Sequence, residues 1–151
     1  MSTINERISE DLKTAMRAKN QMALNVLRSL KSALKYAAIE KFGAEGELSE
    51  TDAVSVVRKE IKKRQDSIEQ FEKAARQELA DNEKAEIALL QGFLPPALSE
   101  TEIEALITQA ITETGATSKA HMGAVMKLVQ ERAAGRAEGR VLSQAVMKKL
   151  G

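Results

Sequence analysis

The last third of the sequence carries an excess of basic side chains whose chemistry suits an anionic partner. Residues 115–151 hold seven basic side chains against two acidic ones, a local charge of +5, whereas residues 99–114 hold four glutamates and no lysine or arginine. Charge segregated in this way favours association with a polyanion. Six of these cations are candidate RNA contacts: Lys119, Lys127, Arg132, Arg136, Arg140 and Lys148.

A short loop bounded by Gly135 and Gly139 contributes to this basic region. Arg136 and Arg140 stand next to these glycines, where guanidinium groups and backbone amides can approach a phosphate closely. No aromatic side chain lies nearby to stack on an unpaired base. Contact with the backbone and shape of a folded RNA is therefore favoured over single-strand recognition, and a purely structural loop is the competing interpretation.

The sequence contains no recognisable catalytic or metal-binding set of residues. His121 is the single histidine and is a conceivable general base, but no nucleophile or carboxylate motif surrounds it, so a surface or capping role is favoured. Glu100 and Glu104 lie one helical turn apart near a helix start, where the helix dipole accounts for their charge. The chain has no cysteine. We therefore expect no catalytic residue, no metal and no cofactor.

A second group of basic side chains occupies residues 58–64, within a long predicted helix. Acidic residues at positions 60, 66 and 69 interrupt it. An ion-paired, solvated surface is favoured here over a strip that binds nucleic acid.

Apolar residues recur at helical spacing along the chain and never alternate as they would in a strand. Ser99 begins a capping box, in which its hydroxyl should accept a hydrogen bond from the Glu102 amide. Both prolines of the chain fall at Pro95 and Pro96, which stop a helix and mark a domain boundary. The predicted helices cover about residues 3–19, 21–41, 50–77, 81 or 82 to 94, 99–115, 118–133 and 142–150.

These patterns predict an all-α protein in two parts. Residues 1–94 should form an N-terminal helical domain of about four helices, and residues 97–151 a small C-terminal three-helix domain. No apolar run approaches the ~20 residues of a membrane span, and no secretory signal opens the sequence. With secretion and membrane insertion set aside, a cytoplasmic location is expected by elimination. The absence of cysteine is compatible with such a reducing compartment.

Three segments together resemble the GatB/YqeY family: residues 92–103 (GFLPPALSETEI), 123–126 (GAVM) and 135–146 (GRAEGRVLSQAV). The resemblance covers essentially the whole chain and is closest to the free-standing YqeY-like proteins. The last third also resembles the C-terminal tail of the B subunit of the tRNA-dependent Asp/Glu amidotransferase, which grips tRNA during transamidation. On this resemblance, Lys127 matches the lysine after Val-Met in that tail, and Arg136 matches the basic residue of its Gly-Lys-Ala segment.

Three functions remain open at this point. The leading hypothesis is a non-catalytic, tRNA-associated accessory protein whose C-terminal domain contacts RNA. The second is a protein-interaction adaptor, suggested by the charge-balanced N-terminal domain and its long amphipathic helix at 50–77. The third, implied by the resemblance, is participation in carbon–nitrogen ligase activity with glutamine as the amido-nitrogen donor. An independent enzyme activity is not expected, because the sequence lacks the serine–serine–lysine system of the amidase. The sequence does not determine the oligomeric state.

Overall fold

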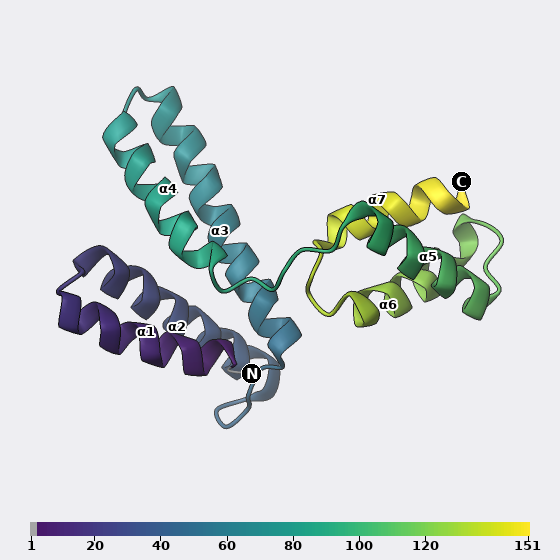
Figure 1. Cartoon of the computed structure of the whole chain (residues 1–151), viewed down its shortest axis with the longest axis horizontal. Helices are drawn as coiled ribbons and strands as arrows, with labels where there is room; N and C mark the ends of the chain where they lie inside the picture. The colour runs from purple at the N-terminus through teal and green to yellow at the C-terminus, as the bar shows by residue number, and fades with distance from the viewer. Residues whose placement is uncertain (1–2) are drawn as a thin grey trace. The chain divides into compact units, whose positions relative to one another are not determined.

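The computed structural model describes residues 3–151, and all regular secondary structure in this range is helical. This part of the chain forms seven α-helices and one short 3-10 turn, with no strand, which confirms the all-α prediction (Figure 1). The chain divides into two compact units, Met1–Leu94 and Pro95–Gly151. Each unit has a separate hydrophobic core.

The first unit consists of two helical hairpins. Helices α1 (Ile4–Ala18) and α2 (Gln21–Phe42) form one, and α3 (Glu50–Lys73) and α4 (Gln77–Gln91) form the other, with α2 packing on both members of the second hairpin. Aliphatic side chains fill the core, as expected for a chain with few aromatic residues. Those that are almost completely buried are Ile4, Ile8, Val26, Leu27, Leu30, Val57 and Leu90.

Short polar side chains begin four of the helices. Each accepts a hydrogen bond from an amide of the first turn that has no partner within its helix. The predicted Ser99 cap is confirmed, since Ser99 Oγ lies 3.1 Å from the amide nitrogen of Glu102. The other three caps are Thr3 before α1, Asn20 before α2 and Ser49 before α3.

The predicted boundary between α3 and α4 is wrong at both helices. The prediction had α3 reaching residue 77 and α4 starting at 81 or 82, but α3 ends at Lys73 and α4 begins at Gln77. Ala75 takes the left-handed conformation (φ 58°), and the amide of Arg76 donates to the carbonyl oxygen of Phe71 at 2.8 Å. This is the hydrogen bond of a Schellman helix end, with alanine in the place that glycine usually takes. No glycine or proline marks the turn in the sequence.

A cluster of charged side chains joins α3 to α4 midway along their hairpin. The Arg64 side chain is only 13% exposed, and its Nη1 lies 3.2 Å from Glu60 Oε2 on the same helix. Its Nε lies 4.0 Å from carboxylate oxygens of both Glu83 and Glu86 on α4. Nearby, Lys62 and Lys63 also pair with acidic neighbours. These contacts agree with the ion pairing predicted for residues 58–64, but the Arg64–Glu60 pair is mostly buried and not solvated as predicted.

The second unit packs three helices around one small core. It contains α5 (Glu100–Thr114), a 3-10 turn η1 (Lys119–His121), α6 (Met122–Ala133) and α7 (Gly139–Leu150). The helix predicted over residues 118–133 starts later, at Met122, because the 3-10 turn η1 precedes it, and the Ser118 side chain makes no cap hydrogen bond. The most buried side chains of this core are Ile107, Ala110, Val125, Val129, Ala133, Leu142 and Val146.

Candidate nucleic-acid interface

Arg132, one of the six predicted RNA contacts, is held in an ion pair within the second unit. It lies in the last turn of α6, and both of its terminal nitrogens contact the carboxylate of Glu113 on α5, with Nη2 2.9 Å from Oε1. The hydrogen bond from Arg132 lowers the pKa of the Glu113 carboxyl, and the same bond raises the pKa of Arg132. Arg132 therefore joins two helices, and its charge is balanced locally.

This ion pair gives a pH-dependent prediction. Because the pKa of Glu113 is lowered in the folded state, its contribution to stability is present above the unfolded value of 4.5 and is lost as pH falls through the folded value. Glu113→Gln should therefore lower the melting temperature at pH 7, and the difference from the unsubstituted protein should vanish well below pH 4.5. Thermal melts followed by circular dichroism over pH 2–7 measure this, and a difference that persists unchanged in acid would contradict it.

Arg136, the second of these residues, anchors its loop to the start of the unit. Its Nε donates to the carbonyl oxygen of Pro96 at 2.8 Å, and its Nη2 lies 3.5 Å from the Glu102 carboxylate. Its own carbonyl oxygen accepts a hydrogen bond from the amide of Leu98 at 2.9 Å. The left-handed conformations of Ala134 and Gly135 turn the chain so that these contacts form. Arg136 is thus mainly tied to protein groups, although its side chain remains 40% exposed.

The other four predicted contacts are exposed, and within residues 3–151 they form no ion pair or side-chain hydrogen bond. They are Lys119 in η1, Lys127 on α6, and Arg140 and Lys148 at opposite ends of α7. A lysine or arginine without a protein partner keeps its full charge available to a phosphate. These four side chains are called the free cations below.

The free cations form two groups along α7. Arg140 and Lys148 are eight residues apart, which is about 12 Å along a helix. At the far end of α7, the Lys119 side chain lies against Gly151, with its Cε 3.1 Å from the position that a β-carbon there would occupy. At the near end, Gly139 lies beside Gln130, one turn after Lys127 on α6. The free cations are therefore spread over the unit and are not gathered in the loop after Gly135.

The sequence interpretation missed three residues that matter here. Lys149 is exposed beside Lys148 and, within the described chain, has no ion pair. Its position in the basic final turn of α7, beside Lys148, would have been enough to include it among the candidate RNA contacts. Glu113 and Glu102 were not identified as partners of Arg132 and Arg136, and a single sequence gives no signal for such distant pairs.

His121 lies at the start of α6, where its ring contacts the preceding turn. It precedes α6, and its Nδ1 is the acceptor for the amide of Thr117 at 3.4 Å. Across residues 3–151, no group of three or more histidine, cysteine, aspartate or glutamate side chains is placed to hold a metal ion. In the same range, no helix has the length and apolar character needed to cross a membrane.

Comparison with known proteins gives consistent matches. A family model described as Yqey-like protein matches residues 5–150. The protein named Altered inheritance of mitochondria protein 41, mitochondrial, from Pyrenophora tritici-repentis is 36% identical over 132 residues, covering 84% of this chain and 71% of that protein. The proteins of the same name from Lachancea thermotolerans and Clavispora lusitaniae are 35% and 32% identical, over 70% and 80% of this chain and 57% and 71% of their own lengths.

These relatives contradict the cytoplasmic location expected from the sequence, because all three are named as mitochondrial proteins. The expectation rested on elimination of secretion and membrane insertion. Those features, and the absence of cysteine, do not distinguish the cytosol from the interior of an organelle. The resemblance to the YqeY-like proteins is confirmed by the match over residues 5–150: this chain belongs to the YqeY-like protein family.

Proposed function

We propose that this helical protein is a non-catalytic accessory factor that associates with tRNA through its C-terminal unit. The observation that carries the proposal is the set of free cations, which have no protein partner within residues 3–151 although acidic side chains are common in the chain. Elsewhere in the same unit Arg132 and Arg136 are paired with glutamates. Exposed cations of this kind are available to bind phosphates and to release the counterions around them.

The surface chemistry favours folded RNA over an unpaired strand. No aromatic residue lies anywhere in residues 95–151, so bases have no ring on which to stack. The free cations are spread along α7 and over α6 and η1, an arrangement suited to backbone phosphates at several places on a folded molecule. The resemblance of this region to the tRNA-gripping tail of the amidotransferase supports tRNA as the RNA, with Lys127 the carried-over residue that has no protein partner in the described chain.

Binding of a fluorescent tRNA transcript to the whole chain, measured between 50 and 200 mM salt, tests this proposal. If about four phosphates are contacted, affinity should fall by about 100-fold over that range. A double-stranded DNA of equal phosphate number is the matched ligand, and it should bind more weakly because its shape differs. Absence of tRNA binding at low salt, an affinity indifferent to salt, or equal affinity for the DNA would each contradict the proposal.

The two other functions receive less support from the structure. The adaptor hypothesis drew on the amphipathic helix at 50–77, but the apolar face of α3 packs inside the first unit, where Val54, Val57 and Ile61 are buried. That face is therefore not open to a partner. Participation in glutamine-dependent amidation stays an alternative. The direct test is whether the purified chain supports that reaction, and we expect that it does not.

A further inference from the structure

Two aromatic side chains lie exposed on the last two turns of α2, in the first unit. Tyr36 is 71% exposed and Phe42 is 53% exposed, and Ile39 between them is 45% exposed. The chain has only four aromatic residues, of which Phe93 is buried and Phe71 is partly buried. Half of the rings in an otherwise aliphatic protein are therefore presented to solvent by one helix, and neither of them belongs to a core.

The loop that follows α2 packs directly on Phe42. A β-carbon at Gly46 would lie 2.0 Å from the β-carbon of Phe42, so the loop can pass this close only with glycine at that position. The Gly46 amide donates to the carbonyl oxygen of Gly43 at 3.1 Å, which closes the loop. The ammonium of Lys41 lies 5.3 Å from the ring centroid, within the range of a cation–π contact. The backbone therefore holds the base of Phe42, while more than half of the residue stays exposed.

Three cations share the face of α2 that carries Phe42. Arg28, Lys35 and Phe42 follow one another at intervals of seven residues, so they lie nearly in one line along the helix. Lys31 lies one turn after Arg28, beside this line. All three cations are exposed, and within residues 3–151 they form no ion pair or hydrogen bond. Exposed cations are common in this protein, and what distinguishes α2 is that exposed rings accompany them.

We propose that this face of α2 binds an unpaired segment of RNA. Proteins that hold single strands combine cations along the backbone with aromatic side chains on which bases stack. Arg28, Lys31 and Lys35 contact phosphates, and the rings of Tyr36 and Phe42 each stack on a base. RNA is chosen over DNA because the second unit is proposed to bind RNA, and at this one step the inference rests on the proposed function.

The dimensions and charge of the face suit such a strand. From residue 28 to residue 42 it is about 21 Å long, which accommodates about six nucleotides at the ~3.4 Å spacing of stacked bases. The helix carries four basic residues and a single acidic one, a net charge of +3, and of its cations only Lys41 is ion-paired, with Asp52 at 2.6 Å. The face therefore attracts a polyanion along its whole length.

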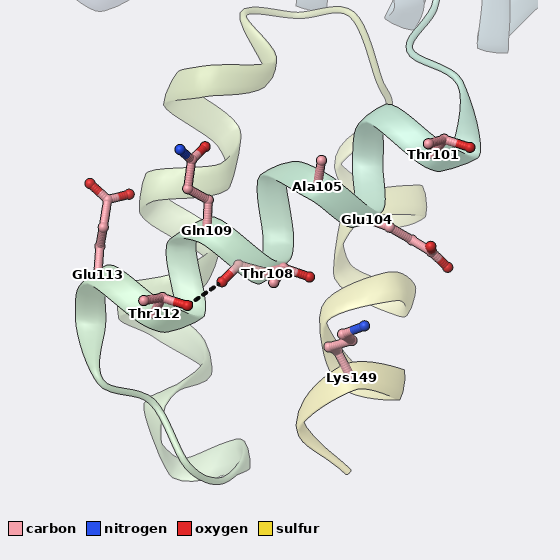
Figure 2. Close-up of a pocket in the computed structure, with 8 residues that line it drawn as sticks. All are labelled: Thr101, Glu104, Ala105, Thr108, Gln109, Thr112, Glu113 and Lys149. Carbon is pink, nitrogen blue, oxygen red and sulfur yellow. Dashed lines mark hydrogen bonds between the residues drawn. The ribbon is translucent and has the colours of Figure 1, made fainter.

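The second unit offers no comparable surface for a base. It contains no aromatic residue. The side chains along its α5 hollow are mostly short, and Figure 2 shows two carboxylates among them, those of Glu104 and Glu113. Carboxylates repel phosphates, and threonine and alanine side chains give a base no ring on which to stack. The two units therefore differ in the RNA features that they can contact, with backbone phosphates at the second unit and unpaired bases at α2.

Other occupants fit the α2 face less well. Lysine is depleted in the core of protein–protein interfaces, whereas two lysines and an arginine line this face. A helix that lies on a membrane exposes an apolar face along its length. The main apolar face of α2 is packed in the first unit, and its exposed aromatic and branched aliphatic residues are confined to the last two turns.

The intrinsic fluorescence of Tyr36 tests the proposal in the whole chain. The protein has one tyrosine and no tryptophan, so its emission comes from this residue. Titration with an oligouridylate of about ten nucleotides at low salt should quench the emission saturably, because a base stacks on the ring. N-acetyltyrosinamide titrated with the same RNA corrects for light absorbed by the bases. Inorganic polyphosphate is the matched ligand without bases, and it should bind without quenching Tyr36.

A pair of leucine substitutions separates base stacking from apolar contact. Tyr36→Leu with Phe42→Leu keeps large apolar side chains but removes both rings, so a fluorescent oligouridylate should bind at least about tenfold more weakly. Tyr36→Phe retains a ring and should stay within about threefold of the unsubstituted protein. Lys35→Glu should weaken binding more than its matched control Lys59→Glu, a charge reversal at an exposed residue of α3. Circular dichroism checks that the helices are retained in each variant.

Three results would overturn the proposal and assign the face to a protein partner. They are an absence of saturable quenching, equal quenching by polyphosphate, and unchanged affinity of the leucine variant. Tenfold tighter binding of the matching deoxyuridine oligomer would overturn the choice of RNA. Because Tyr36 emission reports on α2 alone, this test and the tRNA experiment on the second unit can fail independently.

Discussion

Replacing Lys127 and Arg140 together with glutamate should weaken tRNA binding by about 30- to 150-fold. Both side chains are exposed and, within residues 3–151, without a protein partner, so the change removes two phosphate contacts of about 1–1.5 kcal/mol each. The loss should be uniform across tRNA species, and the salt dependence of binding should become shallower by about two phosphates. Fluorescence anisotropy titrations at several salt concentrations measure both effects.

The matched control exchanges the partners of an ion pair in the same unit. The double substitution Arg132→Glu with Glu113→Arg keeps the net charge and the ion pair between α5 and α6. It should change tRNA affinity by no more than about twofold, since a balanced pair contributes little to counterion release. If this control weakens binding as much as the Lys127 and Arg140 variant does, the free cations are not the interface. If neither double substitution has an effect, the RNA lies on another surface.

Arg64→Met should destabilise the first unit by about 2–4 kcal/mol at neutral pH. The substitution keeps much of the side-chain volume but removes the positive charge next to Glu60, Glu83 and Glu86. Removal of one partner from a mostly buried ion pair is costly because the remaining charges lose their compensation, and here three carboxylates are left together. Denaturant unfolding followed by circular dichroism measures the loss. Lys62→Ala is the matched control, because the Lys62–Asp66 pair is exposed and should contribute less than about 0.5 kcal/mol.

The cost of Arg64→Met should shrink as pH falls. Burial raises the pKa of Glu86 above 4.5, the neighbouring Glu83 raises it further, and Arg64 opposes both effects. Removal of Arg64 therefore raises this pKa again. Between the unfolded value of 4.5 and the raised folded value, the folded state binds more protons than the unfolded state, so stability increases as pH falls through that interval. The stability of the Arg64→Met variant should therefore increase more on acidification than that of the unsubstituted protein. A cost that is equal at pH 7 and pH 5 would argue against a compensating role for Arg64.

The helices could be predicted well where local chemistry determines them. The cap at Ser99 depends on residues within a few positions, and α5 begins directly after it. The prolines at 95 and 96 were expected to stop α4 at residue 94, but α4 already ends at Gln91. The turn at Ala75 could not be predicted, since alanine carries no signal for a left-handed conformation. It forms because the two helices it joins pack along their length, a tertiary effect that overrides local preference.

The candidate interface was predictable in its charge but not in its pairing. The excess of lysine and arginine after residue 115 is visible in the sequence. Which of these cations remain without a partner depends on glutamates in α5, 19 residues from Arg132 and 34 residues from Arg136. Residues this far apart in the sequence come into contact only when the three helices pack together. The candidate RNA contacts without a protein partner therefore lie at Lys127, at Arg140 and at the ends of α7, and not mainly in the loop after Gly135.

The order of the helices also bears on how the chain acquires its structure. Each hairpin joins helices that are consecutive in the sequence, and each core is drawn from one continuous stretch of chain. Contacts between nearby segments require little loop-closure entropy, so such topologies have low contact order and fold fast. The first unit contains every residue of its own core, and its folding can therefore finish on the ribosome while residues 95–151 are still being added.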